Sequence, residues 1–125
     1  MQRAAVTAGA ALAVLATCAS AHAAGDAARG KDAYEARCGG CHSVETDRIG
    51  PRHSGVVGRK AGSVEGFAYS PAVKASGVVW SAQTLERWLA DPEALIPGQR
   101  MGYSLGDAAL RADVIAYLAT LKTAP

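Results

Sequence analysis

The residues with the clearest chemistry lie together in the stretch RCGGCHSVE, residues 37–45. Cys38 and Cys41 stand three positions apart, and His42 follows the second cysteine directly. Side chains in this pattern suit three kinds of site: a redox-active dithiol, one corner of a zinc site, or the point where a haem is covalently attached to the chain. The motif alone does not decide among them, so the choice depends on what surrounds it.

Each of these chemistries requires a different setting. A thioredoxin-like dithiol follows a strand in a β/α pattern, and no segment before Cys38 alternates as a strand would. A zinc site needs four ligands, usually in two close pairs, and His53 can only be nominated as the fourth. In c-type haem attachment, two thiols at this spacing reach the two vinyl groups on one porphyrin edge, and the next residue brings its imidazole beneath the iron. The pattern favours haem, with zinc and dithiol as alternatives.

The first residues of the chain are typical of an export signal. Arg3 is followed by an Ala-rich apolar run and then by Ala21-His22-Ala23, a small-x-small cleavage pattern. The run is too short for a membrane span of about 20 residues. We therefore predict a cleaved secretory signal peptide over residues 1–23 and a location in a bacterial periplasm or another oxidising space outside the cytoplasm. A lipid anchor through Cys18 and an uncleaved anchor are the lesser alternatives.

Composition limits what the remaining domain, residues 24–125, can be. It keeps two of the three cysteines, both inside the motif, so disulfides cannot hold it together. A domain of this size is marginally stable without some other support, and a large apolar cofactor would provide it. The net charge of the whole chain is +2, and no basic run is dense enough for nucleic acid, which excludes that class of partner.

The elements that must position the motif are short helices separated by long loops. Residues 26–37 suit a helix capped by Asp26 that runs into Cys38. Further helices are predicted from Ser70-Pro71 to Gly77, over AQTLERWLA after Ser81, and after Asp107, where apolar residues recur at helical spacing up to Leu121. Residues 46–66 and IPGQRMGYSLG, residues 96–106, are predicted loops. The fold class is therefore all-α, and so much loop is unusual unless it wraps something.

Residues 25–122 resemble the class I cytochromes c, specifically the soluble mitochondrial-like bacterial type. The resemblance rests on segments in the family's order and at close to its spacing: CGGCH at 38–42, GP at 50–51, GRKAG at 58–62, GFAYS at 66–70, Trp80, IPGQRM at 96–101 and DVIAYL at 113–118. It implies the small cytochrome c fold, with short helices and Ω-type loops around one covalently bound haem c.

The resemblance also implies roles for individual residues. Cys38 and Cys41 would carry the haem, His42 would be the proximal iron ligand, the Pro51 carbonyl would accept its other N–H, and Met101 would be the sixth ligand. Met101 is also the one methionine after the signal, in a loop with Pro and Gly where mere packing is a poor explanation. Tyr69, Trp80 and Arg59 match residues near the haem propionates.

Several positions depart from the family pattern. Trp88 stands where relatives often carry a Tyr that bonds the Met sulfur, and Gln99 replaces a Thr next to a propionate. His53 stands at a position that is usually Leu, and we interpret it as a partly exposed histidine rather than a ligand. Glu93 and Ala94 replace lysines that ring the haem edge in relatives, so electrostatic steering of partners should be weak.

The function expected from the resemblance is electron transfer without catalysis. The protein would be a monomer that carries one electron at a His/Met-ligated haem between membrane respiratory complexes or periplasmic redox enzymes, docking to each transiently. Two alternatives are a dedicated electron-entry subunit of one redox enzyme, and a haem enzyme or gas sensor in which a labile Met101 opens the iron.

Overall fold

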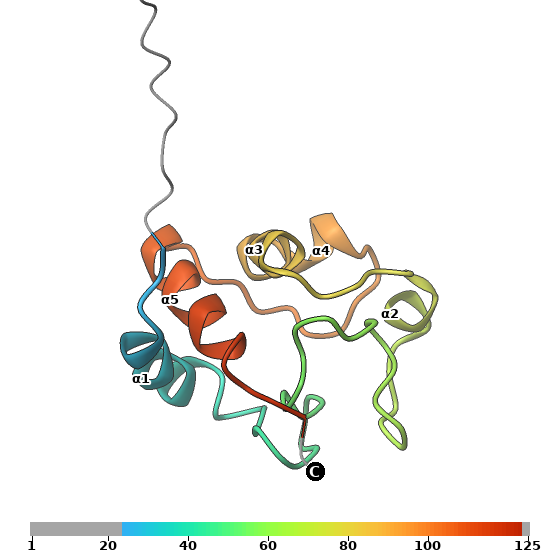
Figure 1. The fold of residues 1–125 in the computed structure, drawn as a ribbon. Helices are drawn as coiled ribbons and strands as arrows, with labels where there is room; N and C mark the ends of the chain where they lie inside the picture. Colours follow the sequence, from blue (N-terminus) through green and yellow to red (C-terminus); the bar gives the residue numbers. More distant parts are fainter. Residues whose placement is uncertain (1–23, 124–125) are drawn as a thin grey trace, which may run out of the picture.

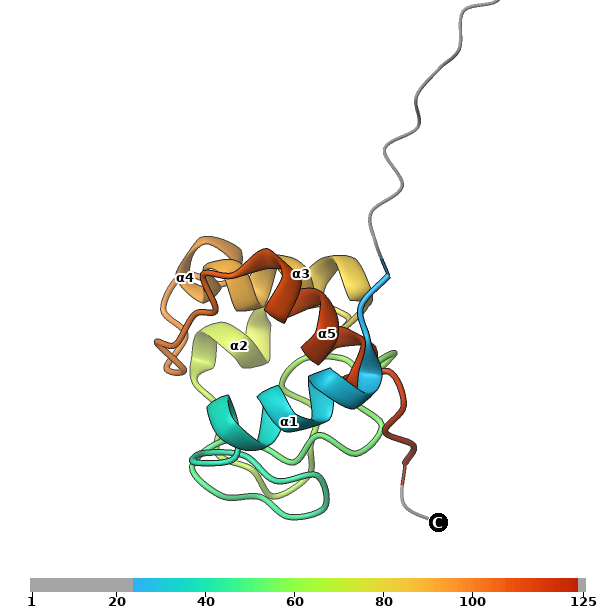
Figure 2. The same cartoon turned by 90° about the vertical axis from the view of Figure 1, so that its left-hand side faces the viewer.

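Two helices of eleven residues cross near the ends of the folded chain and form its rigid frame. The computed structural model describes residues 24–123, and in that range α1 is Ala27–Arg37 and α5 is Ala108–Leu118. Both views of the ribbon place α1 beside α5 (Figures 1 and 2). Close approach is possible because Gly30 of α1 is buried and a methyl group there would overlap the backbone carbonyl of Asp113.

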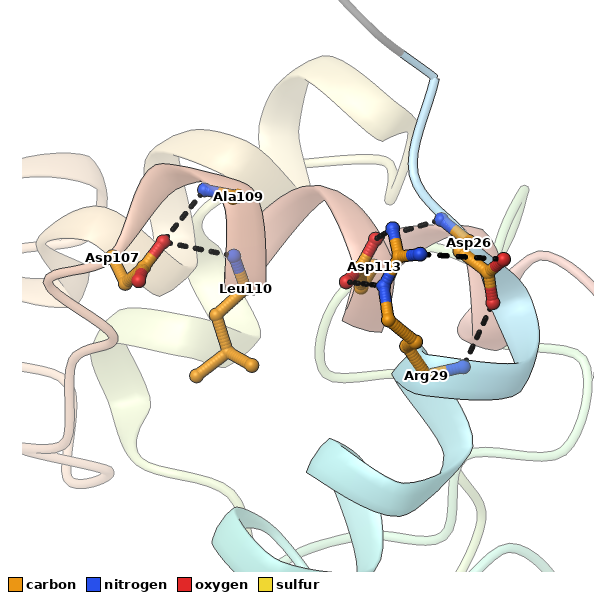
Figure 3. A network of polar contacts seen from close by, with 6 residues as sticks. All are labelled: Asp26, Arg29, Asp107, Ala109, Leu110 and Asp113. Atoms are coloured by element: carbon orange, nitrogen blue, oxygen red, sulfur yellow. Dashed lines mark hydrogen bonds and ion pairs between the residues drawn. The ribbon is translucent and has the colours of Figure 1, made fainter.

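A polar network fastens the start of α1 to the middle of α5. The backbone N–H of Asp26 donates to one Asp113 carboxylate oxygen (2.7 Å), and Arg29 Nε donates to the other (3.0 Å) (Figure 3). Asp26 also caps α1, because its side chain accepts the N–H of Arg29. The ring centroids of Tyr34 and Tyr117 lie 5.3 Å apart at the same crossing. The network aligns α1, the helix that leads into Cys38.

The other helices are shorter and begin at the caps that the sequence predicts. α2 is Pro71–Ala75 with Ser70 as N-cap, and α3 is Ala82–Ala90 with a capping box between Ser81 and Thr84. Residues after Asp91 form one helical turn, α4 (Pro92–Leu95). α5 ends at Leu118 rather than at Leu121, and its cap at Ala119 begins a turn.

The core joins α1, α3 and α5 to the loops between them. It includes Leu85 and Leu89 of α3, Val114 and Leu118 of α5, and Ile96, Trp80 and Val56 from the connecting segments. In residues 24–123 there is no strand, only an isolated bridge between Lys60 and Val79. The all-α prediction is thus confirmed. None of the helices in that range is long and apolar enough to cross a membrane. The predicted signal peptide lies outside the described residues.

Candidate haem-binding site

The C-x-x-C-H motif forms a tight turn at the end of α1. The N–H groups of Cys41 and His42 both donate to the carbonyl oxygen of Cys38, at 3.1 and 2.9 Å. In this turn Cys38 is half-buried and Cys41 is exposed, and both cysteines are free thiols. Burial raises the pKa of the Cys38 thiol to about 11, so this group is protonated at neutral pH. Between residue 24 and the turn the chain forms α1 and no strand, so this described part lacks the strand that a thioredoxin-like dithiol follows.

His42 is held by the backbone of the next segment. Its Nδ1 lies 2.8 Å from the carbonyl oxygen of Pro51. Because a carbonyl can only accept, the proton must be on Nδ1, and Nε2 is left with a free lone pair. Burial lowers the pKa of His42, although the bond to Pro51 acts in the opposite direction. A neutral imidazole with Nε2 free is the form that binds a metal.

Gly50 completes the seat of the His42 ring. A methyl group at Gly50 would overlap the Cε1, Nδ1 and Nε2 atoms of that ring. The N–H of Gly50 donates to the carbonyl oxygen of Cys41 (2.8 Å), so the Gly50-Pro51 segment is tied to the motif on both sides of His42. The glycine is therefore explained by the close approach of an imidazole rather than by a special backbone angle.

The ring of His53 lies against one face of the His42 ring. The two rings are stacked, with centroids 4.2 Å apart and planes inclined by 21°. The Nδ1 atom of His53 is 2.8 Å from the hydroxyl of the buried Tyr34. Burial, followed by the neighbouring His42 and the charge of Arg59, lowers the pKa of His53 to about 3, so the ring is neutral. Among residues 24–123 no three His, Cys, Asp or Glu side chains are grouped to hold a metal ion, which leaves the zinc alternative without a ligand set.

A cavity of about 550 Å³ opens beside the motif. Its lining is mainly apolar and comes from the motif, the long loop, α2, α3 and the 96–106 segment. Nine of the ten predicted site residues meet there: Cys38, Cys41, His42, Pro51, Arg59, Tyr69, Trp80, Trp88 and Met101. These residues come from distant parts of the chain, and their individual roles toward a haem stay predictions.

Arg59 and Tyr69 provide polar groups on the cavity wall. Arg59 donates from Nη1 to the carbonyl of Ser54 (2.9 Å) and from Nη2 to that of Arg52 (2.8 Å), whereas its buried Nε has no partner within residues 24–123. Tyr69 accepts the N–H of Val64 (3.1 Å), so its own hydroxyl proton is free to donate. A buried donor without an acceptor is costly, and a carboxylate entering the cavity would relieve that cost. The polar groups therefore fit a haem, which carries two carboxylates.

Met101 reaches the cavity from an irregular loop. Gly98 and Gly102, with φ of +89° and +58°, let the backbone turn on either side of it. Glu93 accepts the N–H of Gly98 (2.9 Å) and the amide of Gln99 (3.1 Å), and the Gln99 oxygen accepts the N–H of Gly102 (2.9 Å). Gln99 is not among the residues that line the cavity, and its side chain bonds within the Met101 loop, so its predicted place next to a propionate stays a prediction.

Trp88 lies in the cavity wall next to Trp80, with ring centroids 5.3 Å apart. Reasoning from sequence found both indoles but missed two supports of the site. One is the pair of Tyr34 and His53 behind His42, and the other is the carboxylate of Glu93 beneath the Met101 loop. His53 stands out in the sequence because relatives usually carry Leu at this position. No local pattern indicates that Tyr34 is its partner.

The chain is similar to known proteins over most of its length. The Cytochrome c family model matches residues 27–122. The chain is 45% identical over 106 residues to cytochrome c2 of Rhodomicrobium vannielii, covering 82% of this chain and 84% of the relative. It is 44% identical over 98 residues to cytochrome c of Gibberella zeae, covering 75% and 92%. The solved structure of cytochrome cH from Methylobacterium extorquens superposes with a TM-score of 0.73 at 44% identity, covering 77% of this chain and 99% of that one.

Proposed function

This chain belongs to the cytochrome c family, as a class I electron carrier with one covalent haem c and no enzymatic role, and we propose that it carries the electron at an iron held between His42 and Met101. The bound iron supplies the change of oxidation state, and the residues of this chain hold it, shield it and set its potential. The observation that carries the proposal is the bond from His42 Nδ1 to the Pro51 carbonyl, which leaves Nε2 free to ligate.

Cys38 and Cys41 attach the haem in this proposal. Each thiol would add across one vinyl group of the haem, so that a carbon–sulfur bond would form and the thiol proton would go to the neighbouring vinyl carbon. The addition changes no overall electron count and releases no leaving group, and two free thiols at the cavity wall are what it requires. With both bonds made, the haem stays on the chain in both redox states.

Met101 would hold the iron from the side opposite His42. A thioether is soft and favours ferrous iron, so His/Met ligation raises the reduction potential. The apolar lining acts in the same direction, because a low dielectric disfavours the extra positive charge of the ferric state. With both axial positions filled no site is open to oxygen or substrate, as an electron carrier requires.

Tyr69, Trp80 and Arg59 would receive the haem carboxylates, with the unpartnered Arg59 Nε as one donor. The cavity mouth carries few charges for partner docking. Arg37 and Arg100 line it, while Glu93 is exposed nearby on α4. Steering by long-range charge is therefore weak, and docking to membrane respiratory complexes or periplasmic redox enzymes is transient. We also propose export to the periplasm with cleavage after Ala23, a proposal supported by the sequence of residues 1–23 and by haem attachment outside the cytoplasm.

Near-infrared spectroscopy tests the axial ligands. Ferric wild-type protein, matured with its haem, should show the weak band of sulfur-to-iron ligation, and Met101→Ala should abolish it. Tyr103→Phe is the matched control, because Tyr103 lines the same cavity two residues further on and should leave the band unchanged. Absence of the band in the wild type would exclude Met101 as the ligand, and a product of bare polypeptide mass would exclude covalent attachment.

A further inference from the structure

We propose that His53 is a positioning residue for His42: its ring, anchored by Tyr34, fixes the plane of the axial imidazole. The proposal rests on the proposed function, since it takes His42 as an iron ligand. The evidence is the stack of the two imidazoles, 4.2 Å between centroids and 21° between planes, at the wall of the cavity that both residues line.

The bond to Pro51 alone does not fix the plane of the His42 ring. A hydrogen bond from Nδ1 sets one direction within the ring, and the torsion that turns the ring about its bond to the side chain lies in a broad energy well. A flat neighbour restricts that torsion, because any turn would push one ring edge into the neighbour. The His53 ring lies nearly parallel to that of His42 and so provides that restriction.

His53 is itself held from three directions. Its backbone N–H donates to the carbonyl oxygen of Ser43 (3.1 Å), the residue after His42. Its backbone carbonyl oxygen accepts the N–H of Val56 (3.0 Å). The Tyr34 hydroxyl fixes its ring through Nδ1 at 2.8 Å, whichever of the two atoms donates. Tyr34 also meets the ring edge-on, with centroids 5.5 Å apart. The position of the His53 ring is thus determined by the backbone next to His42 and by α1.

A leucine at position 53 would fill similar space but would lose both features that the geometry uses. It has no flat face to lie against His42, and it leaves the Tyr34 hydroxyl, on a side chain only 4% exposed, without the partner seen here. The polar ring at this half-buried position therefore has a physical reason beyond packing. The pair of Tyr34 and His53 acts as a unit.

The plane of the axial imidazole matters for the redox site. The π orbitals of the ring overlap with iron orbitals that lie perpendicular to the ring plane, so the plane determines which iron orbital holds the unpaired electron of the ferric state. Partners of a metal-bound histidine tune the metal through the orientation of the ring in this way. His53 should therefore affect the magnetic spectrum and the reduction potential without touching the iron.

Proton NMR of the ferric holoprotein tests the proposal. The hyperfine-shifted haem methyl resonances report the ligand plane, and His53→Leu should change both their order and their spread. Tyr34→Phe removes only the hydroxyl and should move them in the same direction by less. Tyr117→Phe is the control: Tyr117 packs on Tyr34 from α5, and losing its hydroxyl should leave the methyl pattern unchanged. Reduction potentials measured on the same samples should follow the same order.

A double variant separates positioning from general disturbance. With His53 already replaced by Leu, Tyr34→Phe should have no further effect on the methyl pattern, because the two residues act through one contact. A wild-type methyl pattern in folded His53→Leu protein would overturn the proposal; if that variant does not mature, an unchanged pattern in Tyr34→Phe does so. If the wild type shows no hyperfine-shifted His42 ring protons, it is the proposed ligation by His42 that fails.

Discussion

The segment that carries His42, residues 38–54, and the loop that carries Met101, residues 96–106, hold their site residues by different means. In the His42 segment the bonds end on backbone carbonyls: the His42 ring donates to that of Pro51, the Gly50 N–H to that of Cys41, and the His53 N–H to that of Ser43. In the Met101 loop the glycines on either side of Met101 are held by side chains, because Glu93 accepts the N–H of Gly98 and Gln99 accepts that of Gly102. The N–H groups of Gln99 and Leu105 in that loop donate to backbone carbonyls.

The difference extends to the exposure of these bonds, although His42 and Met101 are both half-buried. The bond from His42 to Pro51 is partly buried, and the segment follows α1, which α5 and the Asp113 network hold in place. The bonds that Glu93 and Gln99 make in the Met101 loop are exposed, and the buried residues of that loop lie toward its ends, at Ile96 and Leu105. Local opening draws on regions whose hydrogen bonds are exposed to solvent. The Met101 loop should therefore open first, while the His42 segment stays folded with the core.

The largest effect is expected where the His42 segment is tightest. Gly50→Ala places a methyl group on the His42 ring, which cannot move away without losing its bond to Pro51. Overpacking of this kind costs about 1–3 kcal/mol. Denaturant unfolding of the holoprotein, followed by haem absorption, measures the loss, together with a lower yield of haem-bearing protein.

Gly106→Ala is the matched control, because a methyl group at Gly106 meets no atom within 4 Å. It should be close to wild type in both yield and stability. Equal stability of the two alanine variants would mean that the His42 ring has room to move, and the contrast between the two regions would lose its main support.

The same contrast explains which parts of the fold and of the site can be predicted from the sequence. The C-x-x-C-H motif itself indicated a haem, because its residues are adjacent in the chain and form one turn. The helices, and the all-α class with them, were predicted from caps and period, since Ser70, Ser81 and Asp107 cap where expected. Family resemblance then indicated the Gly50-Pro51 pair and most of the other residues that meet at the cavity.

The supports that were missed are pairs of side chains with no local signature. The meeting of His53 with Tyr34 depends on how the long loop folds back on α1, nineteen positions away. The bond of the Gln99 amide to Glu93 likewise joins two side chains, which are six positions apart in the chain. Such pairings are decided by tertiary packing, which neither a hydrophobic period nor a capping rule encodes.

A smaller effect is expected from loosening the Met101 loop. Gln99→Ala removes the acceptor of the Gly102 N–H and one of the bonds to Glu93. Such partly exposed bonds contribute about 1 kcal/mol each. The near-infrared sulfur-to-iron band should therefore disappear at lower denaturant concentration than in the wild type, whereas the midpoint of global unfolding should shift less.

Gln83→Ala is the control for that variant, since Gln83 is an exposed glutamine on α3. It should leave the band's denaturant midpoint unchanged. If Gln99→Ala shifts the band and global unfolding by the same amount, then the Met101 loop opens only with the whole domain, and the two regions do not differ in local stability.

The smallest effect concerns acid, and it acts on the helix crossing behind the His42 segment. The Arg29 guanidinium, the Asp26 N–H and the charge of Arg29 hold the pKa of Asp113 below its ordinary value of 3.8. A carboxyl whose pKa is lower in the folded state stabilises the fold above the unfolded value, and this stability is lost as pH falls through the folded value. Asp113→Asn should therefore be less stable than the wild type at pH 7, and the difference should shrink below about pH 4.

Thermal unfolding of both proteins between pH 7 and pH 2 measures this convergence. Glu35→Gln serves as the control, because Glu35 pairs with Lys31 at 3.8 Å on the exposed side of α1, where ion pairs contribute little. Its stability curve should run parallel to that of the wild type. A constant gap between Asp113→Asn and the wild type down to pH 2 would mean that the carboxylate charge does not stabilise the crossing. The position of α1 would then depend on the packing of Gly30 and Tyr34 alone. Acid would have no separate effect on the His42 segment through the helix crossing, and it would weaken that segment and the Met101 loop alike.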